Sequence, residues 1–330
     1  MAREAIDRRA LEVLDALPCV PLGHYPTPVE EMSRLQAALG GGPRLLVKRD
    51  DAISFGFGGN KVRKLELVAA RARAQGADTL ITTGGVQSNH ARATAAAAAR
   101  LGLRCIIVAN GRAPERLTGN ALLDGLLGAE LDYVATREER APRMQTIAAD
   151  LAARGRRPYL IPLGASTPLG ALGFVKAIGE LVRQGVRPDV IVHATSSGGT
   201  QAGLVAGCVL HGLPTRVLGV SADDPAATVV AAVRQILAGV QEHLPVDAAA
   251  LAVARPIEVE DGFVGEGYGI PSDASREAQQ LAALLEAIFV DHTYTAKALA
   301  GLIAGVRSGR FRRSGTVLFW HTGGQVGLFA

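Results

Sequence analysis

The chain reads Gly58-Gly59-Asn60-Lys61-Val62-Arg63-Lys64-Leu65-Glu66 where a predicted helix begins, after a short predicted strand and its polar exit. The two glycines allow a sharp backbone turn, which places Lys61 on the first turn of the helix. The positive end of a helix favours a neutral amine and lowers the pKa of a lysine there, and Lys64 adds like-charge repulsion. A neutral lysine can form a Schiff base with an aldehyde. The alternative is a surface lysine in a capped helix.

Lysine is scarce in this chain, which strengthens the case for Lys61. Of 35 basic residues only five are lysines, namely Lys48, Lys61, Lys64, Lys176 and Lys297. Arginine is used almost wherever charge alone is needed, but an arginine cannot lose its proton and attack a carbonyl. Lys61 is therefore the candidate to hold an aldehyde cofactor.

The composition predicts an α/β protein with an aliphatic core. The 330 residues suffice for one large or two ordinary domains, and 48% are hydrophobic while only 4% are aromatic. The net charge of +4 arises from 35 basic and 31 acidic residues, and no basic run alternates with aromatic residues, so we expect no nucleic-acid partner.

Several other classes of protein are disfavoured as well. The seven histidines show no metal-ligand spacing, and we expect no metal site. The three cysteines, Cys19, Cys105 and Cys208, show no paired spacing, which indicates reduced thiols. Residues 1–7 have mixed charge and no apolar leader, and no apolar run approaches the ~18 residues that a membrane span needs. We therefore expect a cytoplasmic protein with no membrane partner.

Strand-like and helix-like segments alternate along most of the chain. Strands are predicted over 45–48, 79–82, 105–108, 131–134, 159–161, 190–193, 216–220 and 317–320. Helices are predicted over 62–75, 89–100, 114–127, 140–154, 170–184, 200–211, 226–240, 275–289 and 295–307, whereas 241–271 reads as loop with short pieces. This alternation predicts mostly parallel strands joined by right-handed crossovers. Eight strands are more than one compact sheet usually holds, so we expect two sheets flanked by helices, with a cleft between them.

Two glycine-bearing turns follow predicted strands, where ligands bind in open α/β sheets. Residues 195–200 read Thr-Ser-Ser-Gly-Gly-Thr before a helix, so backbone N–H groups, hydroxyls and the helix end can converge on a dianion. The alternative there is an ordinary tight turn. Residues 84–90 read Gly-Gly-Val-Gln-Ser-Asn-His, in which Ser88 or Asn89 is the natural N-cap. Because Gln87, Ser88 and Asn89 offer more donors than a cap uses, this turn suits a substrate carboxylate or the cofactor.

A third group of segments adds hydroxyls to the cleft. His321-Thr322-Gly323-Gly324 follows the last predicted strand, and residues 265–271 and 294–295 supply Tyr268, Tyr294 and Thr295. The tyrosines are equally compatible with a place in the core, because buried tyrosine is common.

Taken together, these motifs resemble the pyridoxal-phosphate enzymes of the tryptophan-synthase-β-like fold (fold type II). The resemblance is closest to the branch that contains D-cysteine desulfhydrase, L-cysteate sulfo-lyase and aminocyclopropane-carboxylate (ACC) deaminase. It runs from about Pro26 to the C-terminus. The motifs are KRDD at 48–51, GGNKxRKLE at 58–66, QSNHAR at 87–92, SSGGTQAG at 196–203, GEGYGIP at 265–271, YTAKALAGLI at 294–303 and HTGG at 321–324.

The resemblance implies a role for each candidate site residue. Lys61 would be the Schiff-base lysine and the base that removes the α-proton, with Tyr268 or Tyr294 as proton donor or pocket wall. The remaining cofactor ligands would be Asn60, Asn89, Ser197, Gly198, Gly199, Thr200 and Thr322. Gln87, Ser88, Asn89 and Thr295 would contact a small amino-acid substrate. Residues 1–57 and 170–330 would form a large cofactor-binding domain and residues 58–169 a small one, in a homodimer.

Two positions favour elimination over ring opening. The deaminases are similar to this chain but have a glutamate where it has Thr295 and a leucine where it has Thr322. A hydroxyl beside the pyridine nitrogen makes the ring a weaker electron sink, which suffices to expel a good leaving group from Cβ. The resemblance therefore implies a carbon–sulfur lyase that converts D-cysteine or L-cysteate to pyruvate and ammonia. The alternatives are an ACC deaminase and a non-catalytic module that binds an anion or the cofactor.

Overall fold

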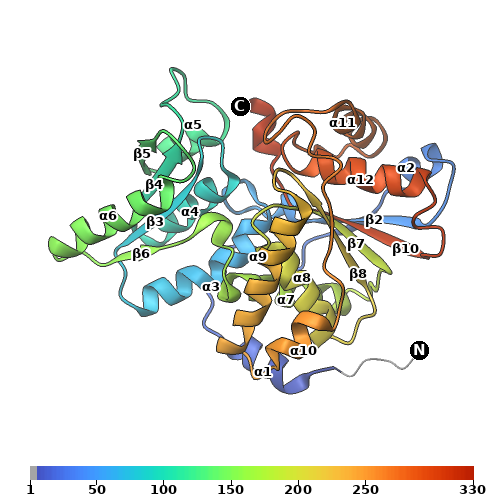
Figure 1. Cartoon of the computed structure of the whole chain (residues 1–330), viewed down its shortest axis with the longest axis horizontal. Helices are drawn as coiled ribbons and strands as arrows, with labels where there is room; N and C mark the ends of the chain where they lie inside the picture. The colour runs from blue at the N-terminus through green and yellow to red at the C-terminus, as the bar shows by residue number, and fades with distance from the viewer. Residues whose placement is uncertain (1–5) are drawn as a thin grey trace.

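The computed structural model of the chain describes residues 6–330 (Figure 1). The protein contains two separate sheets. Residues 1–5 lie outside the described part. The prediction that the chain has no apolar leader rests mostly on these residues. The larger sheet has six strands in the order β1 (Val29–Glu31), β2 (Arg44–Arg49), β10 (Thr316–His321), β7 (Val190–Thr195), β8 (Arg216–Ser221) and β9 (Glu258–Glu260). Only β1 is antiparallel to its neighbour.

The smaller sheet has four parallel strands, in the order β5 (Glu130–Val134), β4 (Arg104–Asn110), β3 (Thr79–Gly85) and β6 (Pro158–Leu160). Its strands come from one continuous stretch of chain, whereas the larger sheet combines strands from both ends of the sequence. The fold class is confirmed: two mostly parallel sheets flanked by helices, as expected for α/β crossovers.

The helices match most of the predicted ones to within a few residues. They are α1 (Arg8–Ala16), α2 (Ser33–Ala38), α3 (Asn60–Ala74), α4 (Asn89–Leu101), α5 (Gly119–Leu126), α6 (Arg140–Ala153), α7 (Pro168–Arg183), α8 (Gly199–Leu210), α9 (Ala226–Ala238), α10 (Ala248–Val253), α11 (Asp273–Glu286) and α12 (Thr295–Arg307). Short 3-10 turns cover Asp50–Ala52, Phe55–Phe57, Leu163–Ala165, Gly239–Glu242 and Gln325–Phe329.

The predicted boundaries were wrong at one helix, and three elements were not predicted. Helix α5 begins at Gly119 rather than at Pro114, because Gly119 has a φ of +51° and the preceding residues form an irregular loop. Strand β1 and helix α2 were missed because they are short. Helix α1 was missed although it is amphipathic, with Ala10 and Leu14 buried on one face. The stretch 241–271, predicted as loop with short pieces, holds α10 and β9.

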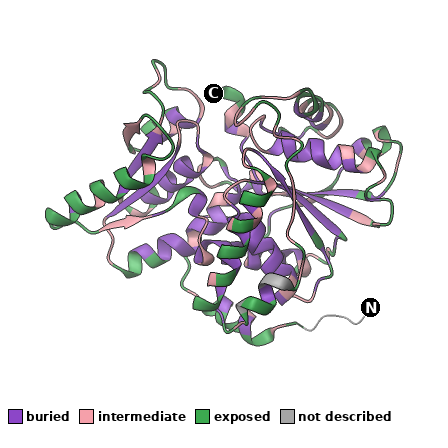
Figure 2. Cartoon of the chain, viewed as in Figure 1, coloured by how far each residue is buried: buried purple, intermediate pink, exposed green. Residues whose placement is uncertain are grey.

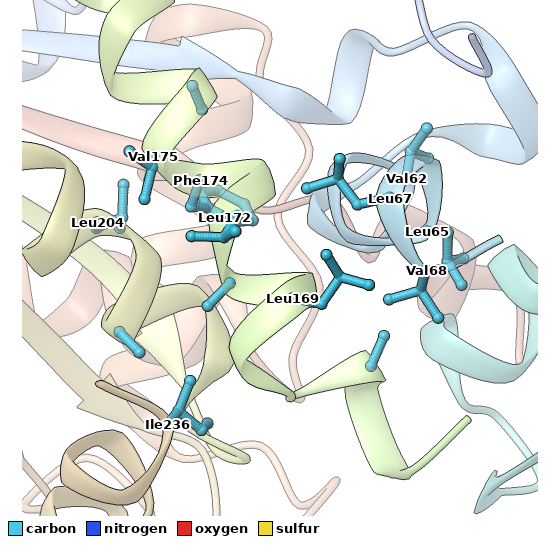
Figure 3. Close-up of a cluster of buried hydrophobic side chains, with 14 of the residues drawn as sticks. Val62, Leu65, Leu67, Val68, Leu169, Leu172, Phe174, Val175, Leu204 and Ile236 are labelled. Carbon is cyan, nitrogen blue, oxygen red and sulfur yellow. The ribbon is translucent and has the colours of Figure 1, made fainter. Parts of the chain in front are cut away.

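An aliphatic core joins the helix that carries Lys61 to the larger sheet. Val62, Leu65 and Val68 of α3 are almost completely buried and belong to the same apolar cluster as Leu172 and Phe174 of α7 (Figure 3). Burial is densest in the inner strands β2, β3, β4, β7, β8 and β10 and in α7, α8 and α12, while the outer helices expose one face (Figure 2). Apolar packing against α7 therefore fixes the start of α3.

A buried ion cluster fixes the same helix by charge. Arg63 Nη2 lies 2.7 Å from Asp50 Oδ1 and Arg63 Nη1 lies 2.8 Å from Glu180 Oε2, while Lys48 also pairs with Glu180. Trp320 Nε1 donates to Asp50 Oδ2 at 2.8 Å. The four charges balance, and each charged residue is at most 5% exposed.

The cluster also makes stability depend on pH. Burial alone would raise the pKa of Glu180, but the Arg63 charge and hydrogen bonds from Arg63 and Lys48 outweigh it and lower this pKa to about 2. The resulting stabilisation is present above the ordinary pKa of 4.5 and is lost as the pH falls toward 2.

We expect Arg63→Met to lower the free energy of unfolding by about 3–5 kcal/mol, because two buried carboxylates would then face Lys48 alone. Urea unfolding at neutral pH measures this loss. Arg44→Met is the matched control, since Arg44 pairs with Glu31 at an exposed site and its loss costs at most about 1 kcal/mol. Equal losses in the two variants would contradict the role of the cluster.

Candidate active site

A cavity of about 430 Å³ lies at the carboxyl ends of strands from both sheets. The turns that follow β2, β3, β7 and β10 all contribute to its lining, as expected for a ligand site in an open α/β sheet. The predicted site residues that line it are Asn60, Lys61, Ser88, Asn89, Ser197, Gly198, Gly199, Thr200, Tyr268, Tyr294 and Thr322. Gln87 and Thr295 do not line it.

The lysine turn packs directly against the turn after β10. Gly59 has a φ of +97°, and a Cβ atom built on Gly323 would lie 2.6 Å from the Gly59 Cα. Asn60 N donates to Thr322 O at 3.0 Å, and the buried Arg92 donates to Gly58 O at 2.9 Å. No side chain fits between the two turns, so glycine is required at both.

Lys61 is a lysine whose proton is easily lost. Burial lowers its pKa to about 8, and it forms no ion pair within residues 6–330. The neighbouring His90 remains neutral because burial, followed by the charges of Lys61 and Lys64, holds its pKa well below the usual range. His90 Nε2 hydrogen-bonds Thr82 Oγ1 at 2.8 Å, which makes it a packed neighbour of the lysine.

The turn before α8 forms a cup that suits a dianion. Gly198 has a φ of +77°, and a Cβ on Gly199 would lie 2.7 Å from Ser166 Oγ and 2.8 Å from Lys64 Nζ. Asn60 Nδ2 donates to Thr200 Oγ1 at 3.0 Å, which ties the cup to the lysine turn. The floor of the cup is bare backbone at the positive end of a helix.

Lys64 supplies the positive charge of this cup. It is 1% exposed and donates only to Gly164 O and Ser166 Oγ, each at 3.2 Å, with no carboxylate partner in the described chain. Burial and then the charge of Lys61 lower its pKa well below the usual value. Without a counterion the buried Lys64 amine favours its neutral form, and a bound phosphate would supply the negative charge that stabilises the ammonium. The residues present therefore fit a phosphorylated cofactor.

The polar side chains of the turn after β3 make two kinds of contact: Ser88 caps α4, and Gln87 and Asn89 bond to the start of α5. Ser88 Oγ accepts from Ala91 N at 3.2 Å and so is the N-cap of α4, while Asn89 Oδ1 accepts from Asn120 Nδ2 at 2.9 Å. Gln87 turns away from the cavity, because its amide oxygen accepts from Asn120 N at 2.8 Å and its nitrogen donates to Thr118 O. Gln87 thus anchors the start of α5.

The two tyrosines, Tyr268 and Tyr294, meet on the opposite wall of the cavity. Their hydroxyl oxygens are 2.5 Å apart and their rings pack edge to face. Burial raises the pKa of both phenols, most strongly that of Tyr294, so both are protonated. Because one hydroxyl donates to the other, one proton of the pair remains free to be donated.

Two buried charges hold the tyrosines in position. Lys297 Nζ donates to Val264 O at 2.7 Å and Gly267 O at 2.8 Å, which fixes the loop that carries Tyr268. Asp291 Oδ2 accepts from Tyr294 N at 2.9 Å, and Asp291 Oδ1 accepts from Thr295 Oγ1 at 2.7 Å. Thr295 is fully buried beneath the wall, so it supports Tyr294 from behind.

Sequence reasoning missed the roles of Lys64, Asp291 and Lys297. The scarcity of lysine was a signal for two of these residues. For Asp291 the only signal was an aspartate placed to cap a predicted helix. Sequence reasoning also missed Arg137, which pairs with Asp223 at 2.6 Å and lies 5.2 Å above the Tyr268 ring. Arg137 thereby links two segments that line the cavity.

Comparisons with known proteins agree with this site. The model of a family described as "Pyridoxal-phosphate dependent enzyme" matches residues 20–323. D-cysteine desulfhydrase of Salmonella typhi is 40% identical over 332 residues, covering 97% of this chain and 98% of the relative.

Solved structures share the fold. A crystal structure described as an ACC deaminase homologue has a TM-score of 0.90 and 35% identity, covering 98% of this chain and 96% of its own. Maize serine racemase has a TM-score of 0.68 at 19% identity, covering 97% of this chain and 95% of its own, and supports the fold alone. No helix within residues 6–330 is long and apolar enough to cross a membrane.

We expect the reaction of Lys61 with pyridoxal phosphate to accelerate about tenfold per pH unit below pH 8 and to level off above it, because the neutral amine is the nucleophile. Borohydride trapping at successive times, followed by mass spectrometry of the Lys61 peptide, measures the rate. Lys61→Arg is the control and should trap none. A rate that still rises tenfold per unit above pH 9 would contradict the lowered pKa, because an ordinary lysine titrates at about 10.4.

Proposed function

Because this chain belongs to the pyridoxal-phosphate dependent enzyme family, we propose that it is a carbon–sulfur lyase acting on a three-carbon amino acid with sulfur on Cβ. D-cysteine would give pyruvate, hydrogen sulfide and ammonia, and L-cysteate would give pyruvate, sulfite and ammonia. The observation that carries the proposal is one cavity that combines a low-pKa lysine, a dianion cup and two protonated tyrosines.

The described residues account for each part of the cofactor. Lys61 would hold the aldehyde carbon. Gly199, Thr200 and Lys64 would hold the phosphate together with Ser197 and Gly198, and Asn60, Asn89 and Thr322 would border the ring. When bound, pyridoxal phosphate accepts the electron pair that the substrate Cα retains after losing its proton.

The chain's own groups would then perform the proton transfers. The Ser88 and Asn89 turn would orient the substrate carboxylate, which places the Cα–H bond beside the Lys61 amine. Tyr268 or Tyr294 would donate a proton to the departing sulfur, since both phenols are protonated at neutral pH.

ACC deaminase activity is the second candidate, because a structure described as a homologue of that enzyme shares 35% identity. Thr322, which lines the cavity next to Lys61, offers a hydroxyl where a stronger electron sink would need a carboxylate. The carboxylates that line the cavity, among residues 6–330, are Glu138, Asp223 and Asp224. Asp223 pairs with Arg137, and Glu138 is the next residue in the chain, so neither is placed beside Thr322. The site therefore favours elimination over ring opening.

We also propose the division into a large domain of residues 1–57 and 170–330 and a small domain of residues 58–169. The four-stranded sheet lies wholly within the second range, and every strand of the six-stranded sheet lies within the first. Helix α3 packs on α7 of the large domain, so its core joins the two units. The homodimer and the cytoplasmic location stay predictions.

We expect purified protein to be yellow with bound cofactor and to release pyruvate from D-cysteine or L-cysteate but no 2-oxobutyrate from ACC. An assay that separates the two 2-oxo acids, run with all three substrates in parallel, measures this, and Lys61→Ala should lower turnover by at least about 10³-fold. Pyruvate from neither sulfur substrate would contradict the lyase. Release of 2-oxobutyrate from ACC would support the deaminase, and cofactor binding without any turnover would support a non-catalytic module.

We expect Lys64→Met to weaken cofactor binding at least tenfold, about 1.4 kcal/mol, because the phosphate loses its buried cation. The apo protein should be no less stable, since removing a buried amine that has no counterion relieves a desolvation cost. Equilibrium dialysis of pyridoxal phosphate and urea unfolding of the apo protein measure the two effects. Unchanged affinity would exclude Lys64 as a phosphate ligand.

A further inference from the structure

Arg140 is a cation in the cavity without an anionic partner. It is the first residue of α6, and its side chain is half-buried in the lining. Its Nε donates to Arg137 O at 3.0 Å and its Nη1 donates to Asn110 Oδ1 at 3.3 Å, both neutral oxygens. It forms no ion pair with any described residue. Guanidinium groups bind carboxylates, phosphates and sulfonates through paired N–H donors, and Arg140 has N–H groups left for such a ligand.

The neighbouring arginines are paired. Arg137 binds Asp223, and Arg143, one turn further along α6, binds Asp132 at 2.6 Å outside the cavity. Glu138 and Asp224 also line the cavity, but neither forms an ion pair with Arg140. The solvent-exposed Glu138 carboxylate attracts Arg140 only at longer range. An unpaired cation in a partly desolvated pocket is costly unless a ligand supplies the opposite charge.

The position of Arg140 relates it to the reacting atoms. Asn110 ends β4 and is paired in register with Gly85 of β3, which leads into the Ser88 turn proposed for the substrate carboxylate. On the other side, Arg137 lies over the ring of Tyr268. Arg140 therefore lies on the wall between the carboxylate turn and the tyrosines, where a substituent on the substrate Cβ would point.

We propose that Arg140 binds an anionic substituent on the substrate Cβ, so that the preferred substrate carries a sulfonate there, as L-cysteate does. This inference rests on the proposed lyase function and names its substrate class. The Cα–H proton passes to the protein, the Cβ–S bond breaks, and its electron pair leaves with sulfur as sulfite. Water then hydrolyses the three-carbon enamine to pyruvate and ammonia. Thiol or chloride substituents offer Arg140 no fixed anion.

Substrate selectivity of the holoenzyme tests the proposal. Arg140→Gln should lower kcat/KM for L-cysteate at least tenfold, mainly through KM, and should change kcat/KM for β-chloroalanine less than threefold. Arg140→Lys, which keeps the charge but not the fork, should recover part of the loss. Arg143→Gln, on the same helix but outside the cavity, is the matched control and should behave as the wild type. Both enantiomers of each substrate are assayed.

Binding of aspartate provides a readout that needs no turnover. Its side-chain carboxylate imitates the anionic substituent and has no leaving group, whereas alanine lacks the second anion. By calorimetric titration, Arg140→Gln should weaken aspartate at least tenfold and leave alanine unchanged.

Each other outcome is decisive. Equal losses for L-cysteate and β-chloroalanine, or for aspartate and alanine, would overturn the proposal and assign Arg140 to the common α-carboxylate or to folding. Unchanged selectivity would also overturn it. If no sulfur substrate is turned over, the proposed lyase function is wrong. The ratio of the affinities for aspartate and alanine still shows whether Arg140 binds a second anionic group.

Discussion

Two cations and two anions, buried together beneath the cavity, form the constraint on which the rest of the structure depends. Asp50 follows β2, Arg63 lies in α3 and Glu180 in α7, so their contacts bind three elements that the sequence separates widely. Lys61 lies two residues before Arg63, and its backbone position is therefore set by ion pairs that never contact a ligand. Such a cluster is costly to desolvate but specific in geometry, which suits a support for a reacting lysine better than apolar packing alone.

The chain uses charge in two opposite ways. In the cluster of Lys48, Asp50, Arg63 and Glu180 every charge has a partner, which fixes these side chains in place. Around the cavity Lys61, Lys64 and Arg140 lack anionic partners among residues 6–330, and each is aimed at space that a ligand can fill. The paired charges of the cluster fix the scaffold, whereas the unpaired cations that line the cavity match the negative charge of a ligand. Lys297, which is held by backbone carbonyls, is an unpaired cation with a structural role. A doubly anionic cofactor and an anionic substrate would together neutralise the site.

Periodicity and turn chemistry were enough to predict the two-sheet fold, because strands and glycine turns are local features. Together with the family resemblance they named 11 of the residues that line the cavity. Side-chain direction was not predictable. Gln87 lies next to the N-cap of α4, yet it faces Asn120 of a distant helix, and Thr295 faces Asp291 behind the cavity wall. The role of Lys297 was not predictable either, since its partners are backbone carbonyls of a loop some thirty residues earlier. Every residue has a backbone carbonyl, so the sequence does not indicate which ones bind a lysine.

The use of lysine has a practical consequence at the outer surface. Lys48, Lys64 and Lys297 are buried and Lys61 opens onto the cavity, so Lys176 is the lysine left with a partly accessible amine outside it. A protein that handles a reactive aldehyde thus offers that aldehyde almost no side-chain amine at which to attach by accident. The same property will frustrate amine-directed labelling, glutaraldehyde fixation and reductive methylation. Conjugation chemistry for this chain has to address the exposed Cys19 thiol or the carboxylates instead.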